Sequence, residues 1–344
     1  MTLQDRLVRK YIDQAIAECQ TNPLSPDFMR RLAGESPSLF FSAAVRRFQV
    51  PVDPGTLDCL TSLLLTLPDL PDLLADPAAC GKDSAIGVYR RLLRAAPAFD
   101  LRFARNLADR LSSDDTPAFD RAKSLRAIDI LEETALDRRL LPIIGHLPSS
   151  PDPKIAAKAT LYVGKRVRSP AWSARYLSNA DSRIRANAIE SIWGLRTPQA
   201  TRLLEQCAGD KNNRVAGNAL VGLRIAGNKQ VDARVSEMSR DASATIRATA
   251  AWMMGAIGTP DWRTPLTQLI RDDDPRARGM ALRALARIRD AARVATRSRR
   301  PGSGTAQTDS ALPADALGEP VPESSGAAAA GPECSPIRPE GSGA

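Results

Sequence analysis

The sequence predicts an all-α fold, a right-handed α-solenoid (superhelix) of stacked helical hairpins. Three observations predict it. A segment of about 31 residues recurs in the second half of the chain. Hydrophobic residues make up 43% of the chain but aromatic residues only 4%, which suits closely packed helices with small side chains. Almost no stretch shows the strict alternation of branched residues that a strand requires. Units of this length bury their apolar sides against one another, so the chain is expected to grow as an elongated stack.

Each copy of the recurring segment has an aliphatic or alanine anchor, an alanine four residues later and an apolar residue eight residues later. These positions lie on one helical face, and the alanine allows neighbouring helices to approach closely. The anchors are 29, 31, 31 and 31 residues apart: Ile155, Ile184, Val215, Ile246 and Ala277. We expect an aspartate before each anchor to cap its helix: Asp152, Asp181, Asp210, Asp241 and Asp274.

Turn residues then separate the first helix of each pair from the second. Gly227 and Gly258 are typical helix ends, and Thr197-Pro198 ends a helix without a glycine. Second helices are expected at residues 199–207 and 265–271. We assign residues 116–293 to this repeat array.

The first third of the chain has helical patterns without a common motif. Helices are expected at residues 2–20, 37–48, 54–67, 84–95, 99–111 and 117–134. We interpret residues 1–115 as an irregular helical region, either degenerate repeats or a cap.

Residues 294–344 are rich in proline, glycine, serine and alanine, and are predicted to be a disordered tail. The chain carries a net charge of +9, but residues 301–344 hold six acids and one arginine, a net charge of −5, which leaves +14 for residues 1–300. A basic body favours anionic partners, either nucleic acid or acidic protein. One hypothesis is that the acidic tail folds back onto the arginines of residues 276–300 and competes with such a partner.

The repeats resemble HEAT repeats, particularly the bacterial type called phycobilisome-lyase HEAT-like. The best copies are residues 181–188, read as Asp-Ser-Arg-Ile-Arg-Ala-Asn-Ala, and residues 274–278, read as Asp-Pro-Arg-Ala-Arg. The resemblance covers roughly residues 150–292. It implies an armadillo-like scaffold for protein–protein interaction whose second helices line a concave surface.

No catalytic constellation emerges, so we expect a protein that is not an enzyme and has no cofactor and no metal. The single histidine, His146, has no second histidine or local carboxylate beside it and is interpreted as a helix-end residue. Glycine-rich phosphate loops and nucleophile elbows are absent from the sequence. The five scattered cysteines and the lack of a long apolar run predict a reduced, cytoplasmic protein without a membrane span.

Candidate partner-binding residues come from two patterns. Trp172 and Trp262 stand at nearly equivalent positions, at the start of second helices, where they either pack the turn or anchor a ligand. A helix continuing past residue 289 would present Arg289, Arg293, Arg297 and Arg300 as one stripe, which either caps the array or follows phosphates. Asn187 and Asn218 share the third position after their anchors and are expected to tie each helix to the neighbouring repeat's loop.

These observations favour a non-enzymatic scaffold or adaptor that binds a partner protein along its curved surface. The alternative is a HEAT-like nucleic-acid-binding protein that uses the basic body. A bilin-lyase-like role is a remote alternative. The partner's identity and the oligomeric state stay open.

Overall fold

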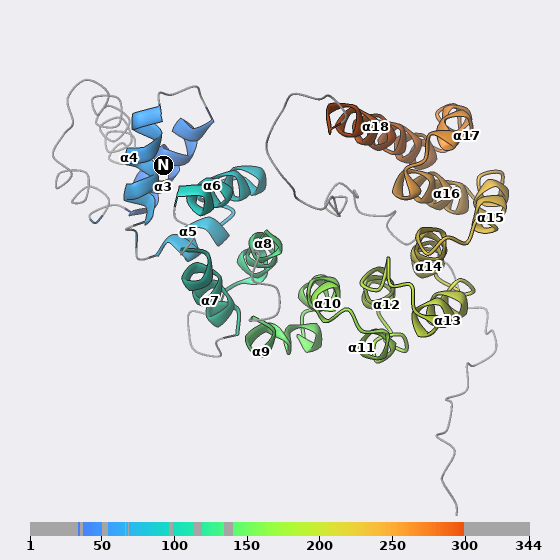
Figure 1. The fold of residues 1–344 in the computed structure, drawn as a ribbon, viewed down its shortest axis with the longest axis horizontal. Coiled ribbons are helices and arrows are strands. Elements are labelled where there is room, and N and C mark those ends of the chain that lie inside the picture. The colour runs from blue at the N-terminus through green and yellow to red at the C-terminus, as the bar shows by residue number, and fades with distance from the viewer. Residues whose placement is uncertain are drawn as a thin grey trace, which may run out of the picture. The chain divides into compact units, whose positions relative to one another are not determined.

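The computed structural model describes residues 34, 37–49, 54–65, 67, 69–95, 99–112, 119–133 and 140–298. Within these residues every regular element is a helix, and the fold is the expected all-α solenoid. The predicted helix at 2–20, residues 299–344 of the predicted disordered tail and Arg300 lie outside the described residues. The predicted start of the tail at residue 294 is wrong, because residues 294–298 continue helix α18. The chain divides into two compact units, Met1–Val235 and Ser236–Ala344, and the boundary falls within a helix. Each unit is described by itself (Figure 1).

The first unit begins with helices that carry no common motif. They are α3 (Pro37–Phe48), α4 (Pro54–Leu65), α5 (Leu70–Ala75), α6 (Lys82–Ala95), α7 (Phe99–Ser112) and α8 (Arg121–Glu132). Four of the expected helices match to within three residues at each described end. The helix expected at 117–134 is shorter, because Asp120 caps it and its Oδ1 accepts the Lys123 N–H at 2.8 Å. Helix α5 was missed, since its six residues are too few for a periodic pattern.

One continuous core joins these irregular helices to the first regular repeat. Phe40, Leu64 and Leu74 are completely or almost completely buried in it, and Tyr89 stacks against Phe103 with ring centroids 5.1 Å apart. The same core includes Tyr162, in the first helix of the repeat anchored at residue 155. The early helices therefore share buried surface with the repeat array and do not form a separate core.

The regular hairpins of the first unit follow in order. Their elements are α9 (Leu141–Ile144), η1 (Leu147–Ser149), α10 (Pro153–Val167), α11 (Pro170–Ala174), α12 (Ser182–Glu190), α13 (Pro198–Cys207), α14 (Asn213–Ile225) and α15 (Val231–Met238). Helices α10, α12 and α14 form one row, and α11 and α13 lie beside it in a second row (Figure 1). The first-row helices approach closely because Ala159, Ala188 and Ala219, the expected small residues, are fully buried between them.

The second unit repeats this arrangement in α16 (Ala244–Ile257), η2 (Pro260–Trp262), α17 (Arg263–Leu269) and α18 (Pro275–Ser298). Helices α16 and α18 pack side by side, with Ala250 and Ala281 fully buried. The two helices approach closely at Gly255, where an added Cβ would lie 2.7 Å from the Cβ of Ala284. Gly258, with φ of 73°, ends α16 as expected.

Cys207 provides a test of the packing between α13 and its neighbours. Burial, followed by the nearby Asp210 carboxylate, raises the pKa of the Cys207 thiol to about 11. At pH 8 only about one thiol in a thousand is then ionised, and the thiolate is the reactive form. We expect the Cys207 peptide to stay unmodified by a thiol reagent in the native protein and to react fully in urea, as measured by peptide mass spectrometry. Modification at the denatured rate under native conditions would contradict this packing.

Candidate partner-binding surface and inter-repeat contacts

Two acceptor positions organise the loops before α12, α14, α16 and α18. At the first position an Oδ1 accepts the backbone N–H of the residue two places later, at 2.7 to 2.9 Å. The acceptors are Asn179, Asp210, Asp241 and Asp272. At the second position, two residues further on, stands the helix cap. Its residues are Asp181, Asn212, Ser243 and Asp274, and all but Ser243 accept a hydrogen bond at the helix start.

The cap prediction is therefore correct for some repeats and wrong for others. Asp152, Asp181 and Asp274 do accept N–H groups from the first turn of their helices. Asp210 and Asp241 do not, because they stand at the first loop position, five residues before the anchor instead of three. Two of the aspartates at this first position, Asp210 and Asp272, have a second partner in addition to the backbone N–H.

That partner is an arginine of the preceding repeat. It stands one residue after the anchor of that repeat, and we call it the latch arginine. The Nη1 of Arg185, on α12, donates to the carbonyls of Asn179 and Ala180 at 2.8 and 3.2 Å. Its Nε and Nη2 donate to the two carboxylate oxygens of Asp210 at 3.1 Å each. One guanidinium thus closes its own loop and holds the loop of the next repeat, 25 residues along the chain.

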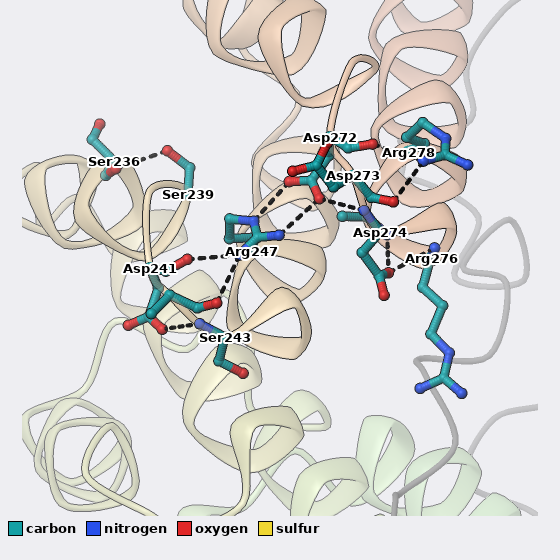
Figure 2. A network of polar contacts seen from close by, with 12 residues as sticks. Ser236, Ser239, Asp241, Ser243, Arg247, Asp272, Asp273, Asp274, Arg276 and Arg278 are labelled. Atoms are coloured by element: carbon teal, nitrogen blue, oxygen red, sulfur yellow. Dashed lines mark hydrogen bonds and ion pairs between the residues drawn. The ribbon is translucent and has the colours of Figure 1, made fainter.

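Arg247 makes the same contacts in the second unit (Figure 2). Its Nη1 donates to the carbonyls of Asp241 and Ala242, both at 2.9 Å. Its Nε and Nη2 reach the oxygens of Asp272 at 2.7 and 2.8 Å. A planar guanidinium supplies this fork of donors, whereas the point charge of a lysine does not. In the repeat between these two, the equivalent position is Ala216.

The Arg247 contact makes the second unit sensitive to acid. The hydrogen bond from Arg247 holds the pKa of Asp272 below its usual value, although burial opposes the shift. Because the folded-state pKa is the lower one, the stabilisation is complete above the unfolded value, about 4, and is lost as the pH falls through the folded value.

We therefore expect the free energy of unfolding to fall less in the Asp272→Asn chain than in the unmodified chain as the pH is lowered from about 5 to about 2. Urea denaturation along this pH series measures the difference. Asp273→Asn is the control, because Asp273 stands next to Asp272 in the same loop. Its side chain is exposed, and only its backbone carbonyl accepts a hydrogen bond, from Arg278. Equal losses in both variants would contradict the assignment.

A second row of polar side chains ties the first helices to their predecessors. Nδ2 of Asn187 donates to the Ala157 carbonyl at 2.7 Å, and Nδ2 of Asn218 donates to the Ala186 carbonyl at 2.9 Å. Both asparagines are buried. They join neighbouring repeats as expected, but the prediction of a loop acceptor is wrong, because both acceptors lie in first helices. Lys158, at the equivalent position, pairs with the buried Asp129 of α8.

Trp172 lies in a partly exposed aromatic cluster on α11. Its ring packs against Gly164 and, in a tilted arrangement, against the ring of Tyr176, with centroids 4.6 Å apart. The guanidinium of the exposed Arg175 lies 5.9 Å from the Trp172 ring and 6.0 Å from the Tyr176 ring. We call Trp172, Arg175 and Tyr176 the Trp172 cluster. Two aromatic rings and an arginine at a partly open surface match the composition of interface centres.

The second candidate tryptophan has a different environment. Trp262 ends the short helix η2 and is only 6% exposed. Its indole N–H is buried, with no hydrogen-bond partner among the residues that the structure describes. The two tryptophans share a sequence position but not an exposure, so Trp172 alone offers its ring to a partner here.

The expected arginine stripe lies on the last helix. Helix α18 continues to Ser298, so residues 289, 293 and 297 share one helical face as the spacing predicts. Arg289 and Arg293 are exposed, and Arg289 pairs with Asp290 at 3.0 Å. No side-chain position is described for Arg297.

Groups that would indicate catalysis are sparse in the described ranges. His146 is exposed in the turn between α9 and η1, a helix end as expected. No cluster of three metal-ligating side chains occurs among the described residues. No helix in the same part of the chain combines the length and apolar character that a membrane crossing requires.

One comparison with known proteins, the match to a family model, agrees with this repeat organisation. Residues 231–296 match the family described as HEAT repeats. No curated protein matches the chain. Among solved structures, human deoxyhypusine hydroxylase in complex with glycerol aligns with 76% of this chain and 99% of its own, at 15% identity and a TM-score of 0.29. The similarity to HEAT repeats thus covers residues 231–296, the segment that contains the Arg247 latch.

Proposed function

We propose that this chain is a non-enzymatic scaffold that binds a partner protein, and that the Trp172 cluster is part of the contact surface. The observation that carries the proposal is the cluster itself, a partly exposed tryptophan with a tyrosine and an arginine against it. Aromatic residues and arginine dominate the binding energy of protein interfaces, because they bury a large area and keep a polar edge.

The contacts of the polar side chains support a structural role for the repeat array. Asp129, Asn187 and Asn218 are buried and directed at neighbouring helices. Asp210 and Asp272 accept the latch arginines. Side chains that would otherwise be candidates for general acid or base chemistry are thus engaged in joining repeats, which leaves the surface as the feature available for recognition.

Photo-crosslinking in the cells that make the protein tests the proposal. Arg175 is replaced by p-benzoylphenylalanine in the full chain, and the exposed Arg202 on α13 is replaced in a matched control. We expect a discrete adduct from position 175 that protease removes and nuclease leaves intact, and a much weaker one from position 202. An adduct that nuclease removes, or equal adducts from both positions, would contradict the proposal.

Nucleic-acid binding is the second candidate, favoured by exposed arginines in the second unit. Arg263 at the start of α17 and Arg271 just after its end are exposed, and so are Arg289 and Arg293 on α18. Arginines that neutralise phosphates release counterions, so binding weakens steeply with salt. A titration of labelled duplex and single-stranded DNA and RNA across a salt series measures this, and no binding at low salt eliminates the candidate.

A further inference from the structure

Arg278 is the latch arginine of the last repeat, and it makes only half of the usual contacts. Its Nη1 donates to the carbonyls of Asp272 and Asp273 at 2.7 and 2.9 Å (Figure 2). These are the carbonyls six and five residues upstream, as for Arg185 and Arg247. Its Nε and Nη2, which bind a carboxylate in the other two latches, form no hydrogen bond to any residue that the structure describes.

The chain supplies no acid at the position that would complete this latch. In both complete latches the carboxylate stands 25 residues after the arginine, and 25 residues after Arg278 stands Ser303. The first acid beyond Asp290 is Asp309. The partly buried guanidinium of Arg278 is therefore a preformed carboxylate receptor at the end of the array.

The nearby acids already have other roles. Asp272 is engaged by Arg247, and Asp274 caps α18 through the N–H groups of its first turn. The exposed Asp273 contributes its carbonyl to Arg278. Local acids do not prevent a latch from forming, because Arg247 also lies against an aspartate loop, at Asp241, and still binds Asp272.

An exposed leucine follows Arg278 along α18. Leu282 is 54% exposed, whereas its equivalent 31 residues earlier, Ala251, is fully buried. The helical repeat places residues 278, 282, 286, 289 and 293 on one stripe. We call this stripe the α18 end face. It combines a carboxylate receptor, an exposed leucine and the exposed arginines 289 and 293, so its complement is a segment that is both acidic and apolar.

The same chain contains such a segment. Residues 309–319 read Asp-Ser-Ala-Leu-Pro-Ala-Asp-Ala-Leu-Gly-Glu, with three acids, two leucines and no basic residue. Helix α18 ends at residue 298, so residue 278 lies about 30 Å back along the helix axis. The 11 residues from 298 to 309 can span up to about 37 Å, which is enough to bring Asp309 back to Arg278.

We propose that residues 309–319 bind the α18 end face in the same molecule, with a carboxylate on Nε and Nη2 of Arg278 and a leucine against Leu282. The acid then completes the last latch in the way that Asp210 and Asp272 complete the others. The proposal is independent of the Trp172 cluster.

A labelled peptide of residues 305–321 tests the proposal by fluorescence anisotropy with the full chain. We expect the peptide to bind the Asp309→Asn/Asp315→Asn/Glu319→Gln chain at least about tenfold more tightly than the unmodified chain, because the intact segment competes at a high effective concentration. The control chain, Glu323→Gln/Glu333→Gln/Glu340→Gln, loses the same charge outside the segment. It is expected to behave like the unmodified chain.

The receptor is tested in the chain with the neutralised segment. Adding Arg278→Gln removes a charge-assisted pair and is expected to weaken peptide binding roughly tenfold. Arg276→Gln removes the same charge two residues away, from an exposed side chain on the other side of the helix, and is expected to leave binding within about twofold. Circular dichroism of both variants establishes that α18 is still folded.

Three outcomes would overturn the proposal. One is equal binding by a peptide with its three acids neutralised. Another is equal affinity of the peptide for the unmodified and the neutralised chain, which means that the segment leaves the end face open. The third is a dimer in sedimentation that Arg278→Gln dissociates, which makes a second copy of the chain the occupant.

Discussion

Gly255→Val is expected to lower the free energy of unfolding of the second unit by about 3 kcal/mol, because α16 and α18 have no room for a side chain where they cross. A Cβ at Gly255 would lie 2.7 Å from Cβ and 2.8 Å from Cα of Ala284. Since the Cα belongs to the backbone of α18, a rotamer change cannot relieve the clash. The helices must separate, although valine gains a few tenths of a kcal/mol in helix propensity over glycine.

The same substitution at Gly279 is the matched control. Gly279 lies in the interior of α18, and a Cβ there would meet only Nη1 of Arg283 at 3.7 Å, an ordinary contact. We expect Gly279→Val to change stability by no more than about 0.5 kcal/mol. Urea denaturation of the full chain measures both, and similar losses in the two variants would contradict the packing of α16 on α18.

Arg185→Leu has the second large expected effect, a loss of about 3 kcal/mol in the first unit. Arg185 is 9% exposed, and its removal leaves the Asp210 carboxylate partly buried without its bidentate partner. Removing one member of a buried pair costs more than the pair contributes, since the remaining charge stays desolvated. The carbonyls of Asn179 and Ala180 also lose their shared donor.

A double-mutant cycle with Asp210→Asn isolates the latch itself. We expect a coupling energy of at least about 1 kcal/mol between the two sites, because they share a bidentate contact. Arg183→Leu, two residues away, is the control, since Arg183 is more exposed and pairs with Asp181 of its own loop. Such an exposed pair contributes at most about 1 kcal/mol. A coupling near zero would mean that the latch does not join the repeats.

Much of this fold could be predicted because the repeats have one periodic apolar face. The anchor spacing and the alanine four residues later located α10, α12, α14, α16 and α18, because close helix packing needs small residues at fixed intervals. The irregular first third was harder. Its helices follow the local apolar period, but their pairing depends on contacts between residues far apart in sequence, such as those in the core that joins α3 to α10.

The latches could not be found from charge composition alone. With 40 arginines among 344 residues, an arginine one residue after an anchor is expected by chance and is not informative by itself. The useful signal is a pair, the arginine together with an aspartate 25 residues later, as in Arg185 with Asp210 and Arg247 with Asp272. The exposures of Trp172 and Trp262 could not be predicted either, since helix η2 buries Trp262 whereas α11 leaves Trp172 partly exposed against the core.

The central claim is that a complete latch, as between Arg185 and Asp210 or between Arg247 and Asp272, joins one repeat to the next, so that the two repeats stabilise each other. Native-state hydrogen exchange of the full chain, with and without Arg185→Leu, tests it most directly. We expect faster exchange in α12 and α14, the helices on either side of the broken latch, and unchanged exchange in α6 and α8. A uniform rise from α6 to α14, or no change in α12 and α14, would contradict the account.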